Sequence, residues 1–246
     1  MTMNWPQITW IVLSSLGLGI TLIKHGEPMN TKYSLWARLF GVLFSAWLLW
    51  CGGFFSQAQA ADIPRDAQQY QRELTRNSRA IWGIDAPVAA FAGQIHQESQ
   101  WKTTARSPVG AQGLAQFMPA TSSWMADIYP AELGANQPYN PSWAMRALVQ
   151  YNRWNWQRIP ATASDCDRMA FTLSAYNGGL GWVQQDRKLA EQRGLDSSRY
   201  WGHTETVNAG RSPANFRENR GYPDRIIRRW QPQYVDAGWG PGVCND

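Results

Sequence analysis

Residues 87 to 99 read Pro-Val-Ala-Ala-Phe-Ala-Gly-Gln-Ile-His-Gln-Glu-Ser, and this stretch decides the fold. Pro87 suits the first position of a helix, because the N–H that proline lacks would have no partner there. Phe91, Ile95 and Glu98 follow the i, i+4, i+7 spacing that places all three on one helical face. The stretch therefore predicts a buried helix with a carboxylate at the end of its apolar stripe.

The position of Glu98 has a chemical consequence. A glutamate on the core side of a helix is desolvated, and desolvation favours the neutral, protonated form. Such a residue can act as an acid near neutral pH. A glutamate that turns to solvent at a fraying helix end is the alternative that this stretch alone leaves open.

The chain after Glu98 contains the start and stop signals of further helices. A turn with Gly110 and Gly113 allows the backbone to approach a ligand, and Gln116 beside it can both donate and accept hydrogen bonds. Pro119 suits the start of the next helix. Asn140-Pro141 predicts the N-cap and first residue of another.

One more helix is predicted before the chain reaches a run of glycines. Ser164, with Asp167 three residues later, resembles a capping box. The helix that they open is expected to end at Asn177-Gly178-Gly179, because glycine suits the position after a helix. After Ser197 the helical periodicity is weak except around Ile226, Ile227 and Trp230.

Three segments now carry a resemblance to a known family. They are Glu98-Ser99, the run Gly113–Thr121 (Gly-Leu-Ala-Gln-Phe-Met-Pro-Ala-Thr) and the run Ala175–Gly179 (Ala-Tyr-Asn-Gly-Gly). In order and spacing they resemble the soluble lytic transglycosylases of the lysozyme-like superfamily, over roughly Pro87 to Leu189. The resemblance implies a mainly α fold like goose lysozyme, with a groove for the glycan strands of peptidoglycan.

The same resemblance assigns roles to individual residues. It implies that Glu98 is the single catalytic acid/base and that Ser99 orients it by hydrogen bonding. Gln116, Tyr176 and Asn177 would line the sugar subsites. A further substrate-binding tyrosine is matched by Tyr222 within residues 218–223, although Gly221 and Pro223 depart from the family pattern there.

The number of carboxylates bears on the mechanism. Most glycosidases use two, and substrate-assisted enzymes are the exception. The three matched segments hold no second Asp or Glu, which favours cleavage of the MurNAc-GlcNAc β-1,4 bond with help from the substrate's acetamido group and formation of 1,6-anhydro-MurNAc. Two alternatives stay open: a lysozyme-type hydrolase on the same scaffold, and a membrane-tethered glycan-binding or lysis protein.

The first 60 residues differ in composition from the rest, because their only charged residues are Lys24, Glu27, Lys32 and Arg38. They contain two apolar runs, residues 8–23 and 39–55, which are short for membrane-spanning helices. One reading is a transmembrane hairpin with its basic loop in the cytoplasm. The other is a signal peptide from about residue 29 to residue 60, ending Ala-Gln-Ala.

Both readings place residues 61–246, the expected catalytic domain with a C-terminal extension, outside the cytoplasm. That domain would be either anchored at the periplasmic face of the inner membrane or free in the periplasm. Cys166 and Cys244, the two cysteines outside the apolar segment, could form one disulfide there. Two unpaired thiols are the alternative.

Charge and composition favour peptidoglycan over other partners. The formal net charge is +5, and the charged residues after residue 60 are mostly interleaved, which argues against a nucleic-acid partner. The three histidines are scattered, so we expect neither a metal site nor a cofactor. Of ten tryptophans after residue 61, we expect two or three to line the groove and the rest to be core.

Overall fold

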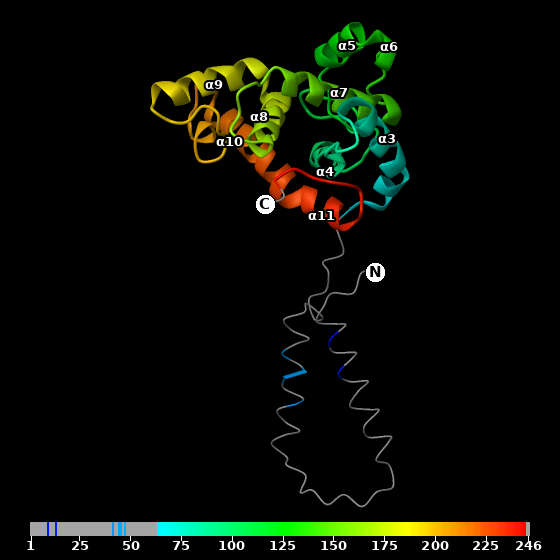
Figure 1. The fold of residues 1–246 in the computed structure, drawn as a ribbon. Coiled ribbons are helices and arrows are strands. Elements are labelled where there is room, and N and C mark those ends of the chain that lie inside the picture. Colours follow the sequence, from blue (N-terminus) through cyan, green and yellow to red (C-terminus); the bar gives the residue numbers. More distant parts are fainter. Residues whose placement is uncertain are drawn as a thin grey trace, which may run out of the picture. The chain divides into compact units, whose positions relative to one another are not determined.

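The computed structural model describes residues 63–244 and, before them, six isolated helical positions, namely Thr9, Leu13, Gly41, Phe44, Ser45 and Trp47. The chain separates into two units, Met1–Ala60 and Ala61–Asp246, and the description below concerns the second (Figure 1). The hydrophobic segments predicted for residues 1–60 fall, apart from those six positions, outside the described residues. Within the described part, no helix is both long and apolar enough to span a bilayer.

The second unit is helical, as predicted, and no named strand occurs between residues 63 and 244. Two isolated β-bridges, Arg106 to Gln112 and Gln112 to Phe117, shape one loop. The elements in chain order are η1 (Arg65–Tyr70), α3 (Gln71–Trp82), α4 (Val88–Ser99), α5 (Pro119–Ile128), α6 (Pro130–Leu133), α7 (Pro141–Gln157), α8 (Asp165–Gly178), α9 (Leu180–Gln192), η2 (Thr204–Thr206), α10 (Pro213–Asp224), η3 (Arg225–Trp230) and α11 (Gln231–Asp236).

The caps predicted for two helices are present. The side chain of Asn140 accepts hydrogen bonds from the backbone N–H groups of the first turn of α7. Ser164 does the same for α8, at 3.0 Å from the N–H of Asp167. Asp167 departs from the capping-box pattern, because its carboxylate binds the Ser164 hydroxyl (2.7 Å) and the N–H of Tyr200 (2.8 Å). It therefore anchors a distant loop as well as the helix.

Helix α4 forms the centre of the unit, with the other helices around it (Figure 1). Phe91 and Ile95 are fully buried, as the stripe predicted. At Gly93 a side chain would meet the backbone nitrogen of Gln231 and the Cβ of Trp230, each 3.1 Å from an added Cβ. Because Gly93 has no side chain, α4 lies directly against the C-terminal helices. This close packing sets the distance between the side chains of α4 and those of the C-terminal helices.

The C-terminal helices α10, η3 and α11 follow one another without a loop (Figure 1). These helices are more continuous than the weak periodicity of their sequence predicted. The exception noted around Ile226 and Ile227 agrees with the structure, because both residues are buried. The middle segment, η3, is a π-helix, a rare form that is frequent at functional sites. Helix α10 packs against α8, whereas η3 and α11 pack against α4. Tertiary packing therefore stabilises these helices where local sequence does not.

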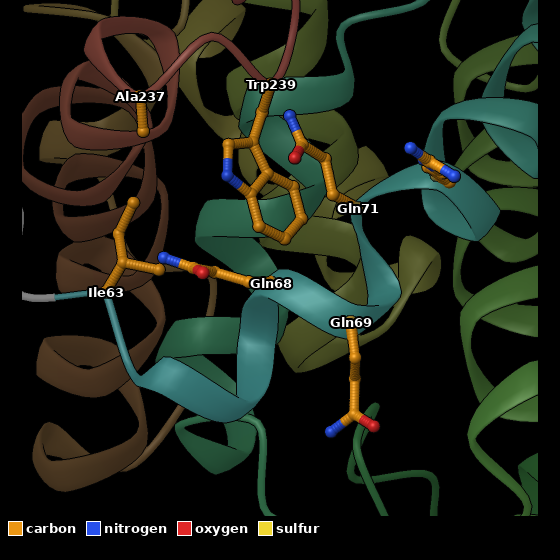
Figure 2. Close-up of a pocket in the computed structure, with 7 residues that line it drawn as sticks. Ile63, Gln68, Gln69, Gln71, Ala237 and Trp239 are labelled. Carbon is orange, nitrogen blue, oxygen red and sulfur yellow. The ribbon is translucent and has the colours of Figure 1, made fainter.

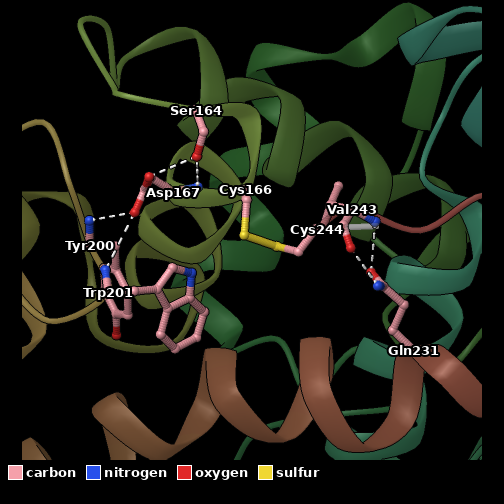
Figure 3. Close-up of a disulfide and its surroundings, with 8 residues drawn as sticks. All are labelled: Ser164, Cys166, Asp167, Tyr200, Trp201, Gln231, Val243 and Cys244. Carbon is pink, nitrogen blue, oxygen red and sulfur yellow. Dashed lines mark hydrogen bonds between the residues drawn. A yellow bond between two sulfur atoms is a disulfide. The ribbon is translucent and has the colours of Figure 1, made fainter. Parts of the chain in front are cut away.

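A disulfide joins Cys166, in the first turn of α8, to Cys244 (Figure 3). Beside it, the side-chain amide of Gln231 donates to the carbonyl of Val243 (2.7 Å) and accepts from its N–H (2.9 Å). The end of the described chain is therefore attached to α8 covalently and to α11 by a pair of hydrogen bonds. Of the two states considered for these cysteines, the structure contains the bonded one.

Candidate active site

A cleft of about 370 Å³ lies where the three sequence motifs meet. Glu98 reaches it from the end of α4, Gln116 from the loop before α5, and Tyr176 and Asn177 from the end of α8. Helix α10 adds Tyr222. Of the six residues predicted for the site, five therefore line one cleft, and Ser99 is the exception.

A larger cavity of about 690 Å³ lies elsewhere, between the start of α3 and the segment after α11 (Figure 2). Figure 2 shows the amide side chains of Gln68 and Gln71 beside Trp239, whereas that of Gln69 is directed away from this ring; all four residues line the cavity. Its lining holds no carboxylate and none of the predicted site residues. It therefore offers no group for acid catalysis.

Burial controls the protonation of Glu98. Desolvation raises the pKa of its carboxyl to about 8, and the negative charge of Glu218 adds to the rise. A hydrogen bond from Tyr222 acts in the opposite direction without reversing it. At neutral pH the carboxyl therefore holds its proton, which is the state that a general acid needs.

A directed chain of hydrogen bonds, two of them buried and the last part-buried, ends at Glu98. The Tyr222 hydroxyl donates to Oε1 of Glu98 and accepts from Nε2 of Gln94 at 3.2 Å. Oε1 of Gln94 in turn accepts from Nδ2 of Asn152 at 2.7 Å. Because each group donates to the next, every bond polarises the one after it. Burial raises the pKa of Tyr222 well above its ordinary value, so the phenol remains a donor.

Ser99 does not take the position predicted for it. Its hydroxyl donates to the carbonyl of Ile95 in the preceding turn, at 3.3 Å. A buried helical serine commonly forms this bond because the carbonyl four residues earlier is the nearest acceptor. In this structure the hydroxyl that is hydrogen-bonded to Glu98 belongs to Tyr222, whereas that of Ser99 binds Ile95.

Hydrogen bonds fix the side chains that form the walls of the cleft, and they leave some donors and acceptors of these side chains unused. Tyr176 donates to the carbonyl of Ala115 (2.7 Å), and its ring is parallel to that of Tyr222, 6.5 Å away. Gln116 donates through its amide nitrogen to Gly113 (2.8 Å), so its oxygen is left to accept. Asn177 accepts from Asn219 (3.1 Å), so its nitrogen is left to donate.

The aromatic rings of the cleft are mostly tyrosines, contrary to the tryptophans expected. The lining rings are those of Phe117, Tyr151, Tyr176 and Tyr222. Trp182 lines a neighbouring cavity of about 340 Å³, which shares Asn177 and Glu218 with the cleft. At the rim, Val109 and Met118 are 76% and 43% exposed. Rings and apolar rim together offer surfaces for the C–H faces of sugars.

Two charged residues of the cleft were not predicted as site residues. Glu218 and Arg225 both line it, three or four residues to either side of Tyr222. A signal was present, because residues three and four apart lie on the same face of a helix. Applying that rule around Tyr222 would have identified both.

The chemistry that this arrangement supports is acid/base chemistry. Glu98 is a protonated carboxyl, and Glu218 is a second, exposed carboxylate in the same cleft. Between residues 63 and 244, no three His, Cys, Asp or Glu side chains are grouped as metal ligands would be.

Comparisons with known proteins show what the chain is similar to. The family described as Transglycosylase SLT domain matches residues 80–197. Among curated proteins, the chain is 33% identical over 108 residues to Membrane-bound lytic murein transglycosylase F of Shewanella halifaxensis, covering 44% of this chain and 21% of the relative. It is 31% identical over 173 residues to the protein of that name from Marinobacter nauticus, covering 63% and 32%. The chain thus spans a third or less of either relative.

The fold is also found in solved structures. An inactive mutant of lytic transglycosylase Slt from Pseudomonas aeruginosa aligns with a TM-score of 0.53 at 20% identity, over 84% of this chain and 30% of that one. At this identity the likeness concerns the fold alone. The family model and the curated relatives show that residues 80–197 are similar to the Transglycosylase SLT domain family.

Proposed function

We propose that this chain is a peptidoglycan lytic transglycosylase, an enzyme that cleaves the β-1,4 bond between N-acetylmuramic acid and N-acetylglucosamine. The observation that carries the proposal is the protonated Glu98 in the cleft, with a pKa of about 8 and a donor, Tyr222, fixed against one of its oxygens. The family match of residues 80–197 supports it.

In the first step Glu98 acts as the acid. It transfers its proton to the glycosidic oxygen, and the bond between that oxygen and the anomeric carbon breaks. The carbonyl oxygen of the sugar's own 2-acetamido group attacks the anomeric carbon and stabilises its positive charge. No protein nucleophile is required.

In the second step the same residue acts as the base. Glu98 is now ionised, and it removes the proton of the 6-hydroxyl of N-acetylmuramic acid. The 6-oxygen attacks the anomeric carbon and displaces the acetamido oxygen, which closes a 1,6-anhydro ring. The proton returns to Glu98, so the cycle balances without water.

A lysozyme-type hydrolase is the second candidate, and one observation favours it. Glu218 places another carboxylate in the cleft, and a base that activates water would convert the same scaffold to hydrolysis. Glu98 would remain the acid in either reaction. The two reactions differ in whether the 6-hydroxyl or a water molecule attacks, and in whether Glu98 or Glu218 acts as the base.

We further propose that the enzyme acts outside the cytoplasm, bound to the membrane through residues 1–60 or released after cleavage at residue 60. The composition of that segment and the membrane-bound relatives support this. Sequencing the N-terminus of the mature protein decides between the two forms. An intact start in the membrane fraction identifies an anchor, and a start at Ala61 identifies cleavage.

The reaction is tested on purified peptidoglycan with the full chain in detergent. Anhydro-muropeptides, identified by mass spectrometry, are the expected products. Reducing ends instead would identify the hydrolase. Glu98→Gln, which keeps the side-chain shape, should lower turnover by about 100-fold or more because it cannot transfer a proton. Wall binding by the unaltered chain without any cleavage would reject both enzymes in favour of a glycan-binding protein.

A further inference from the structure

Arg225 differs from Arg220 and Arg228, two neighbouring arginines of the C-terminal helices. Arg220 pairs with Asp186 at 2.7 Å, and Arg228 pairs with Asp224 at 3.1 Å. Arg225 lines the cleft, and in the described part of the chain no carboxylate oxygen lies within 4.0 Å of its guanidinium. Its Nε is buried and has no hydrogen-bond partner there. The cleft thus contains a permanent cation that forms no ion pair with the described residues, although the carboxylate of Glu218 lines the same cleft.

Gly221 explains how the guanidinium reaches this place. It lies one helical turn before Arg225, in the interior of α10. An added Cβ at Gly221 would overlap Nη1 of Arg225, so the guanidinium lies against bare backbone. Glycine is a poor residue for a helix interior. Its presence here is accounted for by the room that it leaves for Arg225.

The burial of an unpaired Nε indicates what is missing. A buried donor without an acceptor costs free energy, and most such groups in proteins have partners. A guanidinium presents its N–H groups as a planar fork that matches a carboxylate. The group that best completes this site is therefore a carboxylate supplied from outside the chain.

We propose that Arg225 binds a carboxylate of the substrate and so lets the cleft distinguish peptidoglycan from uncharged N-acetylglucosamine polymers. This inference rests on the proposed function. Peptidoglycan offers carboxylates from two sources, the stem peptides and, where these have been removed, the lactyl group of N-acetylmuramic acid. Chitin oligosaccharides have the same backbone linkage and acetamido groups but no carboxylate.

Binding can be measured apart from turnover. The full chain in detergent, carrying Glu98→Gln, is titrated calorimetrically with three soluble ligands: glycan oligomers with stem peptides, the same oligomers with the peptides removed, and chitotetraose. Adding Arg225→Gln should weaken binding of a carboxylate-bearing ligand by about 10-fold or more, because a charge-assisted hydrogen bond is lost. Binding of chitotetraose should be unchanged.

The three ligands identify the source of the carboxylate. A loss confined to peptide-bearing oligomers assigns the stem peptide, and a loss confined to peptide-free oligomers assigns the lactyl group. A loss for both, with chitotetraose unaffected, means that Arg225 accepts either. An equal loss for all three ligands, or no loss, overturns the proposal. Failure of every ligand to bind before Arg225 is altered would instead contradict the proposed function.

Two further variants separate a binding role from a structural one. Arg228→Gln removes a charge from the same π-helix but outside the cleft lining, and it should leave all three affinities unchanged. Gly221→Ala keeps the charge but displaces the guanidinium. It should raise the melting temperature, because alanine favours the helix, while weakening the same ligands as Arg225→Gln. Unchanged affinities in Gly221→Ala would contradict the positioning of Arg225 described above.

Discussion

Tyr222 donates a hydrogen bond to Oε1 of Glu98 although 124 residues separate them in sequence. The bond occupies one carboxyl oxygen as an acceptor, so the proton of the neutral acid resides on Oε2. An acid with one fixed oxygen presents its proton in one direction. The hydrogen bond from Tyr222 therefore affects both the orientation of the Glu98 carboxyl and its protonation.

Tyr222→Phe tests this pairing. The hydrogen bond from Tyr222 lowers the pKa of Glu98 against the larger effect of burial, so its removal should raise that pKa further. The alkaline limb of the kcat/KM profile should move to higher pH, by about one pH unit or more for a bond to a charged group. Turnover should also fall, because the carboxyl loses its fixed orientation.

The control for that variant is Tyr139→Phe, since Tyr139 is 43% exposed and does not line the cleft. It should leave both rate and profile unchanged. A Tyr222→Phe enzyme with a reduced rate but an unmoved alkaline limb would mean that the phenol contacts substrate without tuning Glu98.

The raised pKa of Glu98 predicts how stability depends on pH. The native state holds a proton on Glu98 up to about pH 8, whereas the unfolded chain loses it near pH 4.5. The contribution of Glu98 to the free energy of unfolding is therefore fully present below pH 4.5 and is lost as the pH rises through 8. The difference corresponds to about 4–5 kcal/mol.

Glu98→Gln removes that titration while keeping an acceptor for Tyr222. Its free energy of unfolding, measured by urea denaturation at several pH values, should decline less between pH 5 and 9 than that of the unaltered chain. At pH 9 the variant should be the more stable of the two. Parallel pH curves for the two proteins would show that burial does not hold the proton on Glu98.

Glu218→Gln tests the second carboxylate. Its negative charge raises the pKa of Glu98, so the variant should move the alkaline limb of activity to lower pH. If the substrate supplies its own nucleophile, anhydro-muropeptides should remain the product at a rate within about ten-fold of the original. Loss of all turnover, with reducing-end products from the unaltered enzyme, would identify Glu218 as the base of a hydrolase.

Loss of the Cys166–Cys244 bond should destabilise the fold. The bridge spans 78 residues, and a cross-link of this length restricts the unfolded chain by about 2–4 kcal/mol in free energy. A Cys166→Ser, Cys244→Ser variant should unfold at a correspondingly lower urea concentration. An unchanged midpoint would mean that the hydrogen bonds of Gln231 to Val243 suffice to hold that end.

Much of the fold could be read from local chemistry. The cap at Asn140, the end of α8 at Gly178 and the buried stripe of α4 all depend on residues within one or two turns of one another. Four cleft residues, Glu98, Gln116, Tyr176 and Asn177, could be predicted because they lie in the short contiguous motifs that carry the family resemblance. Signals of this kind survive in a single sequence.

The rest depends on packing between distant segments. The helices after Ser212 form against α4 and α8, and their own sequence, with Gly221 and Pro223 inside α10, argues against such regularity. Ser99 could not be placed, because two acceptors compete for its hydroxyl and only the fold decides between them. Glu218 was not predicted as a site residue, because it enters the cleft from α10, a helix that the hydrophobic periodicity of the sequence does not indicate.

The order of the chain has a consequence for when the cleft is completed. The family-matched residues, 80–197, contain Glu98 but end before Tyr222 and Arg225. During synthesis, which runs from the N-terminus, α4 emerges more than a hundred residues before Tyr222, whose hydroxyl binds the Glu98 carboxyl. A partly synthesised chain thus carries Glu98 without this partner, and the complete cleft is the last feature that the fold acquires.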